Sequence, residues 1–297
     1  MARRPDLTSV ERRLDDAARR LLDRAPGSRI WSGVVEFLVF GAKQAWACVF
    51  GAALLAVIVA ARLWYPQDAA LARNDALTIA AIVIQIAMVW GRLETWSELR
   101  VIVVFHVVGT GMELFKTDVG SWSYDPGGVL RILSVPLFTG FMYGAVGSYM
   151  VRVYRLFDLR FTRYPPLWLT AIVATAIYVN FFTQHFIVDL RWVLLAGVLL
   201  AFGATGMHFR VFRHTLRMPL VAAFALVAFF IWLAENIATY SHAWTYPDQV
   251  SAWHPVSPVK LVSWFLLMII SVVLVTWVYP PRRPDALAAL PVAAEAE

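Results

Sequence analysis

The sequence predicts an all-α protein, a polytopic transmembrane helical bundle of about eight spans built from two parallel four-helix repeats. Composition is the first indication, because 60% of the 297 residues are hydrophobic and 15% are charged, whereas soluble domains carry about 25% charged residues. The second is a series of long apolar runs between Val34 and Val278. The third is a pattern of polar and aromatic residues that recurs 122 residues along the chain. Together they exclude a water-soluble globule.

The first 30 residues predict a cytoplasmic amphipathic arm. Thr8 and Glu11 have the spacing of a capping box, which marks the start of a helix. Val10, Leu14, Ala17 and Leu21 follow as an apolar stripe flanked by arginines. We expect this helix to lie on the inner leaflet, and a solvated arm without a specific role is the alternative.

Residues 31–280 form the predicted transmembrane domain, since runs of roughly 17 to 25 apolar residues are long enough to cross a bilayer. The eight spans are Val34 to Ala61, Leu77 to Trp90, Val101 to Phe115, Ile132 to Val151, Leu167 to Phe182, Trp192 to Met207, Leu220 to Thr239 and Val259 to Val278. The second and third are short, so seven spans remain an alternative. No cleavable signal peptide is expected, because the first run is too long, and residues 281–297 predict a disordered cytoplasmic tail.

Positive charge predicts the orientation. With the N-terminus inside, nineteen of the 26 Lys and Arg residues fall on the cytoplasmic side, which places both termini in the cytoplasm. The net charge of +6 is therefore explained by membrane orientation, and the expected partner is the lipid bilayer rather than a nucleic acid. Cys48 is the only cysteine and cannot form an intrachain disulfide. The sequence indicates neither a cofactor nor an oligomeric state.

An internal repeat is the most informative feature. One copy has Glu113, Thr117, Trp122, Ser123, Tyr124 and Pro136, and the other has Glu235, Thr239, Trp244, Thr245, Tyr246 and Pro258, each pair 122 residues apart. Four spans separate the copies, so both enter the membrane in the same direction. We predict two parallel halves, about residues 31–155 and 160–280, whose glutamates face each other across a cavity open toward the outer leaflet.

Glu113 and Glu235 are therefore the leading candidates for acid–base chemistry. A charged carboxylate at membrane depth costs about 2.5 to 3.5 kcal/mol, so each must be protonated, paired or hydrated. Two carboxyls in one cavity repel, and such a pair can both supply and accept a proton. The alternative is structural: each glutamate caps its loop by binding the Trp or Tyr of its own motif.

Further polar residues complete the predicted site. The catalytic candidates are Glu113, Glu235, His106 and Asp189, and the substrate-binding candidates are Trp122, Tyr124, Trp244, Tyr246, Asn236, His185, Arg191 and Lys116. Lys116 has the helix spacing to pair with Glu113. Histidine and carboxylate together suit iron, manganese or zinc. The spacings typical of a metal site on one helix are absent from the sequence, so we predict no metal ligands.

Three further segments have simpler interpretations. Gly140, Gly144 and Gly147 predict a small-residue face for close helix packing. Glu94 and Glu98 with Arg92 and Arg100 predict a solvated, salt-bridged cytoplasmic loop. The sequence has no phosphate-binding loop, nucleophile elbow or dinucleotide fingerprint, which weighs against primary transport and serine hydrolysis.

Several long motifs resemble a bacterial membrane family, domain of unknown function 817, from about Val34 to Thr276. They are FGAKQAWACVFG, ETWSELRVIVVFH, GTGMELFKTDVGSWSYDP, VPLFTGFMYGAVGSY, NFFTQHFIVDLRW and FIWLAENIATYSHAWTYP. The resemblance implies a bacterial integral membrane protein, and with the charge pattern it predicts a multi-pass protein of the inner (plasma) membrane.

A second resemblance covers about 30 residues. The order Glu113, Gly120, Trp122, Tyr124 and then Val135 and Pro136 is similar to carotenoid hydratases and small membrane lycopene cyclases. That resemblance implies acidic residues on membrane helices that protonate an isoprenoid double bond. The acidic Pro-x-Glu-Glu signature of the cyclases has no counterpart in this sequence.

Two functions are compatible with these residues. The first is an intramembrane acid–base enzyme acting at the outer-leaflet side on a hydrophobic, isoprenoid-like small molecule, with aromatic faces beside developing positive charge. The second is a proton-coupled secondary transporter of a small solute; against it, no span contains Gly and Pro together near its midplane. A structural membrane protein is the third alternative.

Overall fold

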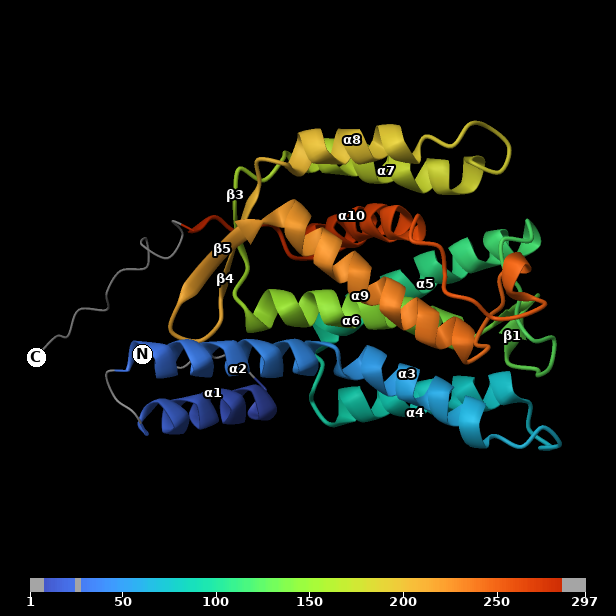
Figure 1. Cartoon of the computed structure of the whole chain (residues 1–297), viewed down its shortest axis with the longest axis horizontal. Helices are drawn as coiled ribbons and strands as arrows, with labels where there is room; N and C mark the ends of the chain where they lie inside the picture. Colours follow the sequence, from blue (N-terminus) through green and yellow to red (C-terminus); the bar gives the residue numbers. More distant parts are fainter. Residues whose placement is uncertain (1–7, 25–27, 285–297) are drawn as a thin grey trace, which may run out of the picture.

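Helices dominate the structure, a computed structural model that describes residues 8–24 and 28–284. Most of the helices run along one long axis (Figure 1). The helices are α1 (Ser9–Leu22), α2 (Arg29–Ala47), α3 (Val49–Trp64), α4 (Arg73–Trp90), α5 (Trp96–Asp118), α6 (Phe138–Leu156), α7 (Leu167–Thr183), α8 (Arg191–Phe202), α9 (Leu220–Tyr240), α10 (Lys260–Val278) and the 3-10 turn η1 (Pro247–Gln249).

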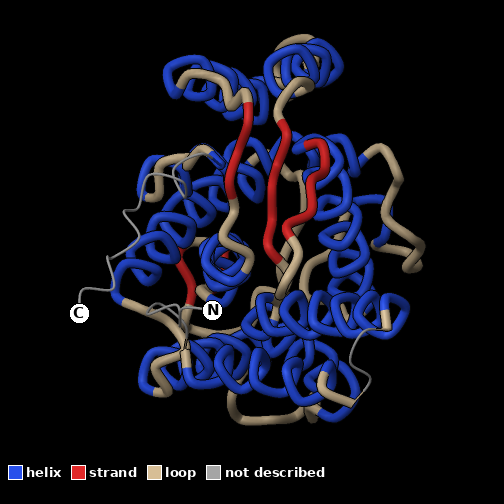
Figure 2. The backbone as a smooth tube through the Cα atoms, turned by 90° about the vertical axis from the view of Figure 1, so that its left-hand side faces the viewer, coloured by secondary structure: helices blue, strands red, loops and turns tan. Residues whose placement is uncertain are grey.

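Two small sheets join the helices at opposite ends. At one end β1 (Arg131–Ile132) pairs antiparallel with β2 (Val135–Pro136). At the other, β3 (Arg160–Thr162), β4 (Gly206–Arg210) and β5 (Thr215–Pro219) form an antiparallel sheet in that order. Figure 2 shows these three strands extending from the α7–α8 pair toward the remaining helices.

Three helices are long and apolar enough to cross a membrane within the described ranges: α4, α9 and α10. Helices α2 and α3 would add a fourth membrane span if they count as one, although they bend by 63° at the break between them. Length and composition thus indicate a mostly helical, membrane-associated protein. The helices α7 and α8 are shorter, with 17 and 12 residues, and α5 carries five charged residues.

The first predicted span, Val34 to Ala61, is wrong as one helix, because the chain breaks at Cys48. The backbone N–H of Cys48 donates to the carbonyls of Gln44 and Trp46. The guanidinium of Arg152 also donates to the Trp46 carbonyl, at 3.1 Å, so that carbonyl is engaged from outside the helix. An arginine distant in the sequence therefore binds the backbone next to the break. The break itself, at Cys48, contains neither Gly nor Pro.

Helix α1 has the predicted capping box, with the Thr8 backbone N–H donating to Glu11 at 2.7 Å. One face of α1 packs on protein: Ala18 and Leu22 pack in one cluster with Val35 and Val39 of α2, joined by residues that follow β4. The predicted stripe of Val10, Leu14, Ala17 and Leu21 stays partly exposed, so its placement on the inner leaflet remains a prediction.

The predicted glycine face of α6 is confirmed, and it packs on α5. A Cβ added at Gly140 would lie 2.4 Å from His106 Nε2, and one at Gly147 would lie 3.0 Å from Phe105. The reverse contact occurs as well, since a Cβ at Gly109 of α5 would lie 2.2 Å from Tyr143 Cγ. These glycines bring α5 and α6 close together.

The loop predicted to be solvated is instead buried. Glu94 is 6% exposed and Arg152 is 1% exposed, and Arg152 Nη2 lies 3.3 Å from Glu94 Oε1. Arg155 bridges Glu98 at 3.0 Å and Glu11 of α1 at 2.8 Å. The carboxylates therefore pair with the last turns of α6 and not with Arg92 and Arg100, whose residues are exposed. We call Glu11, Glu94, Glu98, Arg152 and Arg155 the inner ion network, and we name the two ends of the molecule inner and outer after the orientation that the charge pattern predicts.

Candidate functional site

The two loops that carry the repeated motif, residues 122–124 and 244–246, lie side by side at the end opposite the inner ion network. Ser123 and Thr245 form an antiparallel bridge, with N–H to carbonyl distances of 3.0 and 2.9 Å in the two directions. The Trp122 ring stands edge-on to the Tyr246 ring, with centroids 6.1 Å apart. The repeated motifs, distant in sequence, are thus joined directly.

The helices before these loops end in the same way. In α5 the Gly120 N–H donates to Thr117 and the Ser121 N–H to Lys116, and α9 has the equivalent bonds 122 residues later. This is a Schellman motif. Its left-handed position is Gly120 in the first copy, with φ of 72°, and His242 in the second, with φ of 52°. Helices α6 and α10 also begin and end 122 residues apart.

Glu113 of α5 is the acceptor for three neutral donors. It is 3% exposed. The Trp122 indole donates to Oε2 at 2.8 Å and the Tyr124 hydroxyl to the same oxygen at 2.6 Å. The Tyr143 hydroxyl of α6 donates to Oε1 at 2.7 Å. Both carboxyl oxygens therefore have partners, and none of these partners is a cation.

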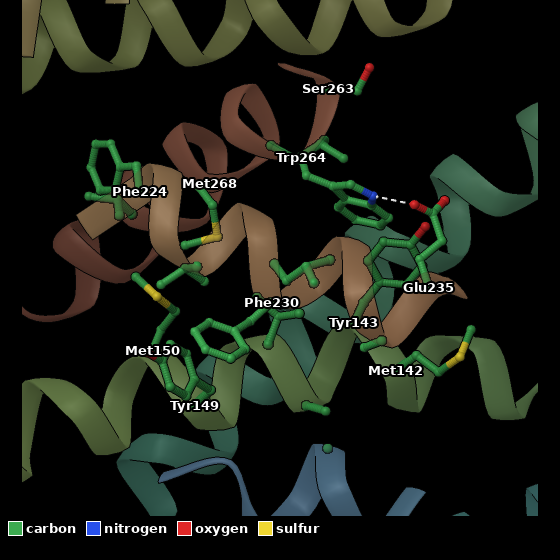
Figure 3. Close-up of a pocket in the computed structure, with 18 of the residues that line it drawn as sticks. Met142, Tyr143, Tyr149, Met150, Phe224, Phe230, Glu235, Ser263, Trp264 and Met268 are labelled. Atoms are coloured by element: carbon green, nitrogen blue, oxygen red, sulfur yellow. Dashed lines mark hydrogen bonds between the residues drawn. The ribbon is translucent and has the colours of Figure 1, made fainter. Parts of the chain in front are cut away.

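Glu235 of α9 has the corresponding arrangement with two donors. It is also 3% exposed. The Tyr246 hydroxyl donates to Oε1 at 2.6 Å, and the Trp264 indole of α10 donates to Oε2 at 2.7 Å. Figure 3 shows the Trp264 bond and places Tyr143 beside Glu235. The loop motif supplies two donors to Glu113 and one to Glu235, and the next helix supplies one further donor to each.

The hydrogen bonds expected for the loop-capping alternative are present: Glu113 accepts from Trp122 and Tyr124, and Glu235 accepts from Tyr246. Both glutamates also line one cavity, so capping and exposure to a shared cavity coexist. Burial, followed by the charge of Glu235, raises the pKa of the Tyr246 phenol well above its ordinary value, and Glu113 adds to this effect. The pKa of this one phenol thus responds to both carboxyls.

Neither glutamate forms a salt bridge among residues 8–24 and 28–284. The predicted pairing of Lys116 with Glu113 is wrong, because the Lys116 ammonium lies 2.8 Å from His185 Nε2 and 4.0 Å from the centre of the Phe181 ring. Burial and then the charge of Lys116 lower the pKa of His185, which favours a neutral imidazole that accepts this hydrogen bond.

The cavity is long and mostly apolar, with a volume of about 1190 Å³. It follows α9 from Leu220 to Ala238, which is nearly the whole helix. Figure 3 shows Phe224, Phe230 and Met268 together with side chains of α6 along its apolar stretch. The two glutamates lie near one end, so the cavity has a polar end and an apolar body.

Most predicted site residues line this cavity. They are Glu113, Glu235, Lys116, Trp122, Tyr124, Trp244, Tyr246, His185, Asp189 and Arg191. Asp189 accepts from the backbone N–H of Arg191 at 2.9 Å and from Asn180 at 3.2 Å, so it also holds the start of α8.

Two predicted residues lie outside the cavity lining and are corrections. His106 packs edge-on against Phe141 with ring centroids 4.8 Å apart, in the space that Gly140 leaves. The Asn236 side chain donates to the Trp232 carbonyl and accepts from the Val256 N–H, at 2.8 Å each. The first fills a helix interface and the second anchors the segment before α10.

Three residues of the site were not predicted: Tyr143, Trp264 and Lys260. Tyr143 and Trp264 supply the donors that come from outside the motifs, and Lys260 lines the cavity beside them. Tyr143 lies between Gly140 and Gly144 of α6. A hydroxyl beside a face that packs closely on another helix is the one sequence feature that could have identified it. Nothing in the apolar sequence of α10 distinguishes Trp264.

In the part of the chain that the structure describes, no three His, Cys, Asp or Glu side chains gather as a metal site. The cavity's polar end instead offers carboxyl, hydroxyl, indole and ammonium groups. Such groups can move protons and bind polar atoms of a ligand.

Comparison with known proteins places the chain in a family. Residues 36–272 match the family DUF817, described as a protein of unknown function. The protein YoaT of Bacillus subtilis (strain 168), described as uncharacterized, is 41% identical over 242 residues, which is 82% of this chain and 91% of YoaT. The crystal structure of a cross-linked MvINS trimer aligns with a TM-score of 0.47 and 12% identity, over 64% of this chain and 98% of that one. By the family match and the YoaT identity, the chain belongs to the DUF817 family.

Proposed function

We propose that this protein is a multi-pass protein of the bacterial inner (plasma) membrane with eight spans, namely the bent pair α2–α3 and the helices α4 to α10, in two parallel four-helix halves. The matching bounds of α6 and α10 and the matching ends of α5 and α9 support the duplication. The 23 residues of α5 extend about 34 Å, enough for a hydrocarbon core of about 30 Å. The excess of Lys and Arg at the inner end supports cytoplasmic termini.

We further propose that the protein is an intramembrane acid–base enzyme whose substrate is a hydrophobic, isoprenoid-like molecule. The observation that carries this proposal is a pair of buried carboxyls, held by neutral donors, at the polar end of a long apolar cavity. The apolar body accommodates a hydrocarbon chain, because ligand pockets are mostly apolar with a few placed polar groups. The carboxyls are where a proton can be given or taken.

In this mechanism one of Glu113 and Glu235 acts as general acid and the other as base or as stabiliser of a carbocation. Neither carboxyl has a bonded cation in the described part of the chain, so each can change its protonation state without breaking an ion pair. Trp122, Tyr124 and Tyr246 hold the carboxyls in place, and their π faces stabilise positive charge on a substrate carbon. Trp244 lines the same cavity.

Lipid analysis of cells tests this function. Membranes from cells with the wild-type protein are compared with those carrying Glu113→Gln or Glu235→Gln, and Glu36→Gln serves as the matched control, because Glu36 binds the β4–β5 connection and lies outside the cavity lining. Each cavity variant should reduce formation of the product lipid by about 100-fold or more, while the control retains it. A lipid and pigment profile that does not respond to either cavity variant would overturn the enzyme.

The break between α2 and α3 favours a second candidate, a proton-coupled transporter. Cys48, at the break, lines the cavity, and broken helices often form the binding sites of secondary transporters. Solute uptake into vesicles with an imposed proton gradient separates the two candidates. Gradient-dependent flux that Glu113→Gln abolishes, with an unchanged lipid profile, supports transport over catalysis.

A further inference from the structure

Three cationic side chains line the polar end of the cavity: Lys116 near the end of α5, Arg191 at the start of α8 and Lys260 at the start of α10. They are close enough that the charges of Lys260 and Arg191 act on Lys116. Lys116 is 2% exposed. Three neighbouring like charges, one of them buried, are unfavourable without an anion between them.

The contacts of the two lysines leave N–H donors unused. In the described residues the Lys260 ammonium has no hydrogen bond or ion pair, and it lies 4.2 Å from the centre of the Tyr246 ring and 6.0 Å from that of Trp122. Lys116 contacts His185 and the Phe181 ring. An ammonium has three N–H donors, and aromatic faces attract the charge without accepting those hydrogen bonds in the usual geometry.

The carboxyls Glu113, Asp189 and Glu235 line the same end of the cavity, but within the described ranges only one of the three cations is paired with a carboxylate directly. Arg191 is paired with Asp189 and donates to Gln184 at 3.0 Å. Neither lysine has a salt bridge of this kind within residues 28–284. Glu235 acts on Lys260 from a greater distance, while the oxygens of Glu235 are engaged by Tyr246 and Trp264. Both ammonium groups therefore line the cavity without a bonded counter-ion from the residues that the structure describes.

We propose that these three cations bind a phosphate group, and that the substrate is an amphiphile with a phosphate headgroup on a long hydrocarbon chain. Phosphate fits because it carries up to about two negative charges and several strong acceptor oxygens. The apolar cavity along α9 holds the chain. From Leu220 to Glu235 the helix covers about 22 Å, which is room for an extended chain. This inference rests on the proposed function, since it names the substrate class of the same cavity.

The arrangement places the chemistry at a defined part of the substrate. With the phosphate against Lys116, Arg191 and Lys260, the first carbons of the chain lie beside Glu113 and Glu235. The acid–base step then acts near the headgroup end rather than at the far end of the chain. The aromatic rings of Tyr246 and Trp122 hold the Lys260 ammonium at the polar end of the cavity.

Binding measurements on the purified full-length protein in detergent test this inference. The probes are geranylgeranyl monophosphate, geranylgeraniol and inorganic phosphate, and binding is read by quenching of tryptophan fluorescence. We expect the monophosphate to bind at least tenfold more tightly than the alcohol, and inorganic phosphate alone to bind weakly. Lys260→Gln and Lys116→Gln should each weaken binding of the monophosphate about tenfold and leave binding of the alcohol unchanged.

Control variants make the test decisive. Lys260→Arg keeps the charge and should retain binding, and Arg62→Gln removes an outer cation that does not line the cavity and should have no effect. Thermal unfolding verifies that each variant is folded. If Lys116→Gln does not fold, the result for Lys260→Gln decides the test. Equal affinity for alcohol and monophosphate, equally tight binding of inorganic phosphate alone, binding of no probe, or indifference to the lysine variants would each overturn the headgroup site. The proposed enzymatic activity is tested separately, by the lipid profiles of cells that carry Glu113→Gln or Glu235→Gln.

Discussion

Buried carboxylates at the two ends of this molecule are satisfied in different ways. At the inner end Glu11, Glu94 and Glu98 pair with Arg152 and Arg155. At the outer end Glu113 and Glu235 are equally buried, but their donors are tyrosine hydroxyls and tryptophan indoles. The three inner carboxylates share two arginines, while the outer ones face a cavity.

This difference separates a structural role from a chemical one. An ion pair fixes both partners in their charged states, because neutralising one leaves the other buried and unpaired. Neutral donors orient a carboxyl without fixing its charge in that way. The inner network therefore suits the joining of α1, α5 and α6, and the outer pair suits proton transfer.

The largest effect should follow from Arg152→Leu in the inner ion network. It leaves Glu94 buried without its cation, which should lower the free energy of unfolding by about 3 to 5 kcal/mol. Glu113→Gln should lower it by no more than about 1 kcal/mol, because the amide keeps an acceptor oxygen and removes a buried charge. Unfolding in mixed detergent, followed by tryptophan fluorescence, measures both.

The double variant Arg152→Leu with Glu94→Gln is the control for that comparison. It removes both charges, so it should recover much of the loss. Equal destabilisation by Arg152→Leu and Glu113→Gln would contradict the contrast between the two ends.

The next effect concerns the close approach of α5 and α6 that positions Tyr143. Gly109→Ala places a methyl group 2.2 Å from the Tyr143 ring, so it should cost about 1 to 3 kcal/mol and displace the donor to Glu113. Gly111→Ala is the matched control on the same helix, because its Cβ meets no atom within 4 Å. Thermal unfolding of both variants measures the difference, and equal melting temperatures would refute this packing constraint.

A smaller effect is expected from Tyr143→Phe, which removes one of three donors to Glu113. The loss should be about 0.5 to 1.5 kcal/mol in stability, with a larger proportional loss of product lipid. Tyr178→Phe is the control, since the Tyr178 ring packs on Phe182 and its hydroxyl has no hydrogen bond in the described residues. If Tyr143→Phe leaves product formation unchanged, this hydroxyl does not support the site.

The smallest effect is a pH dependence at Asp189, which holds the start of α8. Burial acts to raise the pKa of this carboxyl, but the backbone N–H of Arg191, Asn180 and the Arg191 guanidinium together lower it below its ordinary value. Its contribution to stability is therefore fully present above the unfolded pKa of about 3.9 and is lost as pH falls through the folded pKa. The melting-temperature difference between wild type and Asp189→Asn should be largest near neutral pH and disappear in acid. A difference independent of pH would contradict this origin.

The sequence predicts the outer site better than the inner one. A constant offset between two copies identifies Glu113 and Glu235 together with their loop aromatics, because local motifs carry their own hydrogen-bond partners. The bridge between Ser123 and Thr245 joins segments with no periodic signal, so the sequence does not specify it. Tyr143 and Trp264 come from the following helices, where helix packing decides which side chain reaches the carboxyl.

At the inner end the sequence prediction fails for a related reason. Local spacing pairs Glu94 and Glu98 with Arg92 and Arg100, but the structure pairs them with Arg152 and Arg155 of α6. Arg152 also reaches the Trp46 carbonyl at the end of α2, next to a break that hydrophobicity alone does not mark. Long side chains in tertiary contact override the local pattern in both cases.

Glu113 and Glu235 should act as a unit in one cavity. A double-mutant comparison tests it most directly: the rate of product-lipid formation is measured for wild type, Glu113→Gln, Glu235→Gln and the double variant. Residues that act together lose activity non-additively, so the double variant should be no more than slightly worse than either single one. Losses that multiply in the double variant, or single variants with wild-type rates, would contradict a shared site.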